Sequence, residues 1–113
     1  MELLVFVLNK PDELEPLLKA FVDIGIKGAT VIDTQGMATF FDKTEDLPMF
    51  GSLKMLVNKN HKSNKTIFVV LNHDLVKTAI QTIKDVVGDL SEPNVGILFT
   101  LPLSHVEGGT LTY

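Results

Sequence analysis

The chain uses one arrangement twice: an apolar, strand-like run followed by a helical pattern that stops at a glycine. The tripeptide Val-Leu-Asn closes both runs, at Asn9 and at Asn72. Gly25 follows Asn9 by 16 residues, and Gly88 follows Asn72 by the same 16 residues. A strand–helix–strand unit used twice restricts the fold far more than composition does.

Two helices are predicted by apolar residues spaced three and four apart, over residues 12–24 and 74–87. The apolar faces consist of Leu14, Leu17, Leu18, Phe21 and Val22 in the first helix and Leu75, Val76, Ala79, Ile80, Ile83 and Val87 in the second. Gly25 suits a left-handed cap on the first helix. Asn72 or Asp74 would cap the start of the second, and Gly88 would end it.

Four strands fit around these helices, at residues 2–9, 29–35, 66–71 and 96–102. The order βαββαβ with right-handed crossovers places both helices on one face of a four-stranded, mostly antiparallel sheet. We therefore expect a ferredoxin-like α+β fold. Its other sheet face would be bare and apolar, which favours oligomerisation.

Residues 37–65 separate the two units and are expected to form an extended loop. A connection this long in a compact domain is usually functional or mobile. Its second half contains Lys54, Lys59 and Lys62 and no acidic residue, so we expect it to contact an acidic or phosphate-bearing partner. A short helix over residues 47–57 is an alternative for its middle.

The length of 113 residues indicates one domain spanning 1–113. There is no Cys, which excludes disulfides and thiolate ligands, and there is no Arg, because the basic residues are all Lys. A net charge of −4 argues against nucleic acid as a partner. No apolar run approaches the ~20 residues of a membrane span, and no signal peptide is evident, so we expect a soluble cytoplasmic protein.

Catalytic and metal-binding patterns are missing from the sequence. The serines lie in no nucleophile elbow, and His61, His73 and His105 form no pair with metal-ligand spacing. His105, with Glu107 two residues on, is the best ligand candidate among them. Phe6 and Phe68 lie in predicted strands, where core packing explains both better than RNA stacking does. We expect no enzyme, no metal site and no nucleic-acid interface.

The stretch KPDELEPLLKAFVDIGIKGATVIDTQGMA, residues 10–38, resembles the N-terminal half of the PII signalling family. The shared features are Lys-Pro after the first strand, a helix ending in an acidic-x-Gly-Ile-x-Gly motif, a following Ala-Thr-Val, and Gly36. The last strand, GILFTLPL, is similar to the family's GKIFVLPV. The resemblance covers about residues 1–38 and 66–103.

This resemblance implies a homotrimer whose intersubunit clefts hold an adenine nucleotide, and a long loop that touches a regulated protein target. It implies that Gly28 and Thr30 contact the adenine or the ribose. It also implies that the Gly36 backbone contacts a phosphate and that Val69 lies beside the nucleotide. The complete set of ligand-binding residues that it implies is Gly28, Thr30, Gly36, Met37, Val69 and Gly96.

The segment DLSEPNVG departs from the family pattern, because Ile97 stands where the family has a phosphate-binding Lys. Asp89 and Glu92 add negative charge that repels a triphosphate. The Arg-bearing segment that the family has after the last strand is here SHVEGG. These departures argue against tight ATP binding and favour a less charged adenine ligand, such as AMP or a cyclic dinucleotide.

Three hypotheses follow. The first is a PII-like trimeric regulatory protein that senses a small molecule and acts through residues 37–65. The second is a ferredoxin-like dimeric enzyme with His73 or His105 as its acid–base group. The third is a metal-responsive trimer of the CutA type, against which the lack of Cys and of paired His argues. Oligomeric state separates the first two.

Overall fold

The computed structural model describes residues 1–41 and 63–109, and the bounds of its elements lie close to those that the sequence predicts. The elements are β1 (Glu2–Leu8), a 3₁₀ turn (Pro11–Glu13), α1 (Leu14–Asp23), β2 (Thr30–Thr34), α2 (Met37–Phe41), β3 (Asn64–Leu71), α4 (His73–Val87) and β4 (Gly96–Pro102).

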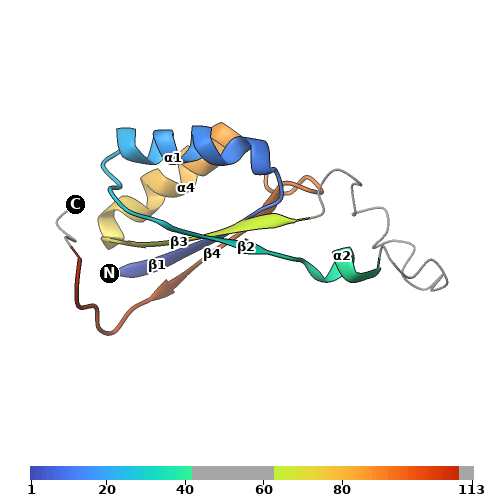
Figure 1. The fold of residues 1–113 in the computed structure, drawn as a ribbon. Helices are drawn as coiled ribbons and strands as arrows, with labels where there is room; N and C mark the ends of the chain where they lie inside the picture. Colours follow the sequence, from blue (N-terminus) through green and yellow to red (C-terminus); the bar gives the residue numbers. More distant parts are fainter. Residues whose placement is uncertain (42–62, 110–113) are drawn as a thin grey trace.

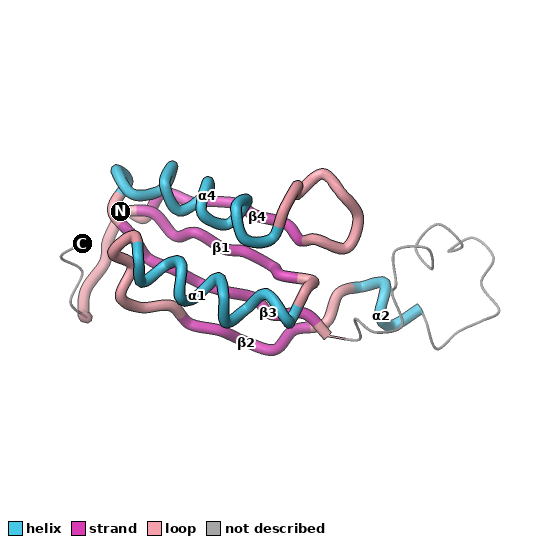
Figure 2. Tube along the Cα trace, turned by 90° about the horizontal axis from the view of Figure 1, so that it is seen from above, coloured by secondary structure: helices cyan, strands magenta, loops and turns pink. Residues whose placement is uncertain are grey.

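The four strands form one sheet in the order β2-β3-β1-β4, and all three neighbouring pairs are antiparallel. Helices α1 and α4 lie side by side on one face of this sheet, and no described helix covers the other face (Figure 1). Seen from above, α1 runs along the β3 and β2 side and α4 along the β1 and β4 side (Figure 2). The predicted ferredoxin-like α+β fold is confirmed.

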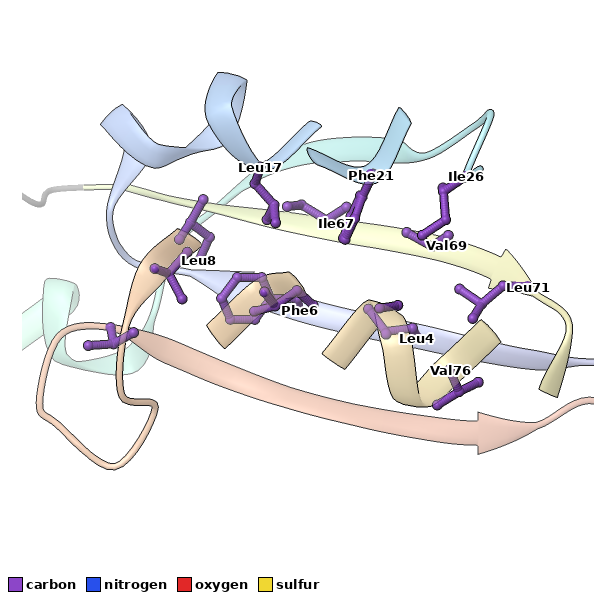
Figure 3. Packing of buried hydrophobic residues seen from close by; sticks show 14 residues of the cluster. Leu4, Phe6, Leu8, Leu17, Phe21, Ile26, Ile67, Val69, Leu71 and Val76 are labelled. Atoms are coloured by element: carbon purple, nitrogen blue, oxygen red, sulfur yellow. The ribbon is translucent and has the colours of Figure 1, made fainter. Parts of the chain in front are cut away.

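The core fills the space between the sheet and the two helices (Figure 3). Alternate residues of β1 and β3 point into it, because side chains of a strand alternate between its faces. Its largest fully buried side chains are Leu4, Phe6, Leu8, Leu17, Phe21, Ile67, Val69, Leu71 and Ile83. The apolar stripes on α1 and α4 bury against this face, as the sequence periodicity predicts.

The helix ends show why these segments stop where they do. Gly25 has a φ of +96°, and its N–H donates to the carbonyl of Val22 at 3.0 Å. Gly88 has a φ of +94° just after α4. Only glycine takes up such a conformation at little cost. At the start of α4, the Asn72 side chain accepts a hydrogen bond from the Asp74 N–H at 3.0 Å, so Asn72 is the cap.

The long connection expected over residues 37–65 has regular structure at both ends, which the sequence did not predict. Residues Met37–Phe41 form the short helix α2, and β3 begins at Asn64, where Asn64 and Lys65 pair with Thr34 and Asp33 of β2. The alternative helix over 47–57 lies outside the described residues. In the described parts of the chain, no helix is long and apolar enough to cross a membrane.

Candidate functional site

The face of the sheet that the helices leave open, here called the open face, is mostly apolar. Strand register brings one row of Phe99, Val5 and Phe68 together, because directly paired residues share a face. The apolar residues that register assigns to the open face are Leu3, Val5, Val7, Ile32, Phe68, Val70, Ile97, Phe99 and Leu101. Ile97 is 60% exposed and Phe99 is 45% exposed in the single chain.

Four neutral polar side chains, here called the amide–hydroxyl cluster, lie together at one end of the open face. Thr34 Oγ1 donates to Asn64 Oδ1 and lies 2.6 Å from Thr66 Oγ1. Asn64 Nδ2 donates to Asn9 Oδ1 at 3.1 Å. The cluster thereby joins the end of β1, the end of β2 and the start of β3, where the chain leaves the sheet for residues 35–63.

Gly36 lies beside this cluster, and Met37 follows it in the chain. A Cβ built on Gly36 would sit 3.5 Å from Asn64 Nδ2, which is an ordinary contact, so the described chain itself does not require glycine there. Met37 begins α2 and is exposed. At the same end of the sheet, Gly96 begins β4 opposite Leu8, and the Asn9 N–H donates to the carbonyl of Val95 at 3.0 Å.

The other three predicted ligand residues lie away from that end. Thr30 pairs with Phe68 in the middle of the sheet, and Gly28 precedes it. Thr30 is about 13 Å from Thr34, because a strand advances ~3.3 Å per residue. Val69 is 1% exposed, so its side chain belongs to the core between sheet and helices. One copy of the chain therefore does not bring all six predicted residues into one site.

The loop between α4 and β4 is ordered by its own contacts. The Asp89 carboxylate accepts hydrogen bonds from the Ser91 N–H at 2.9 Å and from the Ser91 hydroxyl at 2.8 Å. These bonds stabilise the ionised form and hold the pKa of Asp89 below its ordinary value. Lys10 Nζ donates to the carbonyl of Val87 at 3.1 Å, which ties the β1 end to the last turn of α4.

Two hollows flank the helices. The larger, of about 630 Å³, lies between the C-terminal half of α4, the following turn and Leu98 of β4. The smaller, of about 210 Å³, lies between the end of α1 and the start of β2 and includes Gly28 in its lining. Neither contains Gly36 or the amide–hydroxyl cluster, so each is distinct from that end of the open face.

The described histidines form surface pairs. His73 contacts the Glu2 carboxylate. His105 Nε2 lies 2.6 Å from Oε1 of Glu107, its neighbour two residues on in the sequence. Among residues 1–41 and 63–109, no three His, Asp or Glu side chains come together in a way that would hold a metal ion.

The core-packing interpretation holds for Phe6, which is fully buried, but it is wrong for Phe68. Register places Phe68 on the open face, because it pairs with Val5 and Thr30 there. Lys54, Lys59 and Lys62 lie outside the described residues.

Sequence reasoning missed the amide–hydroxyl cluster. Asn64 follows Asn9 by 55 residues and Thr34 by 30, and the residue types match no motif. The available signal was partial: Asn9 and Thr66 stand at ends of predicted strands and Thr34 stands next to one, whereas Asn64 falls inside the predicted loop over residues 37–65.

The strand order and the two helices on one face define the chain as a ferredoxin-like α+β protein with a long excursion between its second and third strands. A family model described as nitrogen regulatory protein P-II matches residues 1–108, so the chain belongs to the P-II family. The predicted resemblance is confirmed, and the chain is a PII-like regulatory protein. No curated protein matches it.

Proposed function

We propose that the protein is a homotrimer that senses a small molecule in clefts between its subunits and signals through residues 37–65. The P-II family match supports its regulatory character. Signalling would be a population shift: the ligand binds one arrangement of the excursion more tightly and so raises the share of that arrangement.

The apolar open face supports assembly. Ile32, Ile97, Phe99 and Leu101 are all well exposed in the single chain. A contiguous apolar face of this kind marks an interface, since burial of apolar surface contributes about 25 cal/mol per Å². In a cyclic trimer these faces would line a shared interior.

The separation of the predicted ligand residues carries the proposal. Gly36, Met37 and Gly96 lie at the end of the sheet with the amide–hydroxyl cluster, whereas Gly28 and Thr30 lie farther along β2. Two copies of the chain, each contributing one group, would bring both groups into one compact site. This is the arrangement that an intersubunit cleft provides.

The partner surface in this proposal is the segment of residues 37–65. The described start of this segment, helix α2, leaves Met37 65% exposed and Phe40 61% exposed. These apolar side chains would support contacts to a protein target beside those expected from Lys54, Lys59 and Lys62. Because α2 follows Gly36 directly, a ligand bound at Gly36 would change the position of α2.

A thermal-shift panel tests the sensor function. The chain is heated with ATP, ADP, AMP, adenosine, cyclic AMP or cyclic dinucleotides, each near 1 mM. A compound at ~100 times its Kd adds ~2.7 kcal/mol, which is several degrees in Tm for a domain of this size. We expect a shift with at least one adenine compound that is lost in Gly36→Val.

The control is the ligand-free Tm of Gly36→Val. It should stay close to that of the unsubstituted chain, because the space at Gly36 admits a Cβ and its φ lies outside the left-handed region. Shifts that persist unchanged in Gly36→Val, or no shift with any compound, would argue against a sensor cleft at this position.

A further inference from the structure

The smaller of the two hollows, here called the apolar groove, lies at the end of the sheet where β2 begins. We propose that residues 110–113 of the same chain dock in this groove, with the side chains of Leu111 and Tyr113 packed against Val22. The inference goes beyond the proposed function and does not depend on which small molecule the protein senses.

The apolar groove exposes hydrophobic surface. Its apolar lining includes Leu18, Phe21, Val22, Ile26 and Val31. Val22 is 68% exposed and Val31 is 37% exposed, so the described residues leave this surface uncovered. The groove's volume of about 210 Å³ is below the ~300 Å³ from which small-molecule pockets usually start. It therefore suits inserted side chains better than a small-molecule ligand.

The chain that follows β4 runs toward the apolar groove. Strands β4 and β2 are the two edges of the sheet, three strand spacings or about 14 Å apart. Residues 103–109, here called the crossing segment, are long enough to cover that width, because an extended chain advances ~3.3 Å per residue. In both views, the chain after β4 ends on the side of the molecule where the turn from α1 to β2 lies (Figures 1 and 2).

The crossing segment is held against the rest of the chain. The Leu103 N–H donates to the carbonyl of Met1 at 3.1 Å, and Leu103 and Val106 are both half-buried. At its end, Gly108 and Gly109 have φ of +97° and +70°, which change the direction of the chain. The four residues that follow thus start at the groove end of the molecule and span at most ~14 Å.

The sequence of residues 110–113, Thr-Leu-Thr-Tyr, fits this groove. It alternates polar and apolar side chains, so an extended conformation would place Leu111 and Tyr113 on one face, ~7 Å apart. A tyrosine combines an apolar ring with a polar tip. Among the described residues that line the groove, only the exposed Lys27 is charged, and it could meet that tip. As an edge strand, β2 also offers backbone groups to an extended segment beside it.

Tyrosine fluorescence of the full-length protein tests the inference. Tyr113 is the only tyrosine and the chain has no tryptophan, so the emission reports on this residue alone. We expect acrylamide to quench it less in the protein than in the free peptide Thr-Leu-Thr-Tyr. Val22→Asp should abolish this shielding, because a carboxylate in the groove disfavours an apolar occupant. Thr78→Asp is the matched control, since it adds the same charge at an exposed position on α4 and should keep the shielding.

A mixture of two variants identifies which copy supplies the occupant. Val22→Asp retains the tyrosine and lacks a working groove, whereas Tyr113→Phe retains the groove and lacks the tyrosine. When the two chains are refolded together in equal amounts, docking within one chain predicts that the tyrosine stays as open to acrylamide as in Val22→Asp alone.

Three results would overturn the inference. One is a tyrosine in the unsubstituted protein that is quenched as strongly as in the free peptide. Another is shielding that Val22→Asp leaves unchanged, because the ring would then be covered elsewhere. The third is shielding that returns in the mixture, because the groove would then hold these residues of another copy. None of these results bears on the sensor function, which the thermal-shift panel tests separately.

Discussion

Gly96 is fixed by the chain itself and needs no ligand to explain it. Its φ is +154°, and a Cβ there would overlap the Val7 carbonyl oxygen and lie 2.8 Å from Phe6 Cε1. Both neighbours belong to β1 at the centre of the sheet, so neither moves aside easily. Among the described residues, none crowds a Cβ at Gly28 or Gly36, so packing in the described fold explains Gly96 but neither of those two.

We predict that Gly96→Ala lowers the free energy of unfolding by at least about 2 kcal/mol, because overpacking and backbone strain act together. Gly28→Ala should change it by no more than about 0.5 kcal/mol. Urea denaturation at one fixed protein concentration measures both. Equal stability of the two variants would contradict the claim that the fold requires glycine at position 96 but not at position 28.

Among the described residues, Asp89 is the one whose pKa the structure clearly lowers. Ser91→Ala removes the hydroxyl bond to its carboxylate and should raise the pKa of Asp89 toward 3.8. The depressed pKa of the folded state contributes stability above the pKa of the unfolded chain, and this is lost as pH falls through the folded value. A carboxyl-detected NMR titration measures the pKa, and an unchanged value in Ser91→Ala would refute the contribution of the hydroxyl bond and leave the Ser91 N–H bond as the cause.

At the scale of elements, α4 begins at a cap that its sequence predicts. Asn72→Ala leaves the Asp74 N–H without its acceptor and should cost about 1 kcal/mol of stability, whereas Asn72→Asp keeps an acceptor and should cost much less. Chemical denaturation monitored by circular dichroism compares the two. A similar loss in both variants would show that the Asn72 side chain acts otherwise than as a cap.

The elements that the sequence predicts well are those with a repeating apolar pattern. Both long helices and all four strands lie within about two residues of their expected bounds. The start of β3 was missed because Asn64 and Lys65 are polar, and their strand conformation depends on pairing with Thr34 and Asp33. Helix α2 was missed because five residues are too few to show a helical period.

The candidate site was predictable only in part, because a site is made by residues distant in the chain. Resemblance to the P-II family pointed to Gly36 and Gly96, which the fold places at one end of the sheet. It gave no reason to consider Asn9 and Asn64, since amides at strand ends carry no recognisable motif. Their meeting depends on the register of β1 against β3.

At the scale of the whole molecule, assembly of the proposed trimer depends on burial of the open face. Four of its apolar side chains, Ile32, Ile97, Phe99 and Leu101, are 44–60% exposed in one chain, and under the proposed function the predicted ligand residues would form one site between copies. Phe99→Asp places a charge in the middle row of the open face and should dissociate the assembly, because burying an unpaired carboxylate is strongly unfavourable. Thr78→Asp adds the same charge at an exposed position on α4 and should leave assembly intact.

Light scattering after size exclusion is the measurement that tests the central claim most directly. The unsubstituted protein and Thr78→Asp should elute with a molar mass near three times the 12.4 kDa of one chain, and Phe99→Asp near that of one chain. A mass near one or two chains for the unsubstituted protein at micromolar concentration would contradict a trimer with intersubunit ligand clefts.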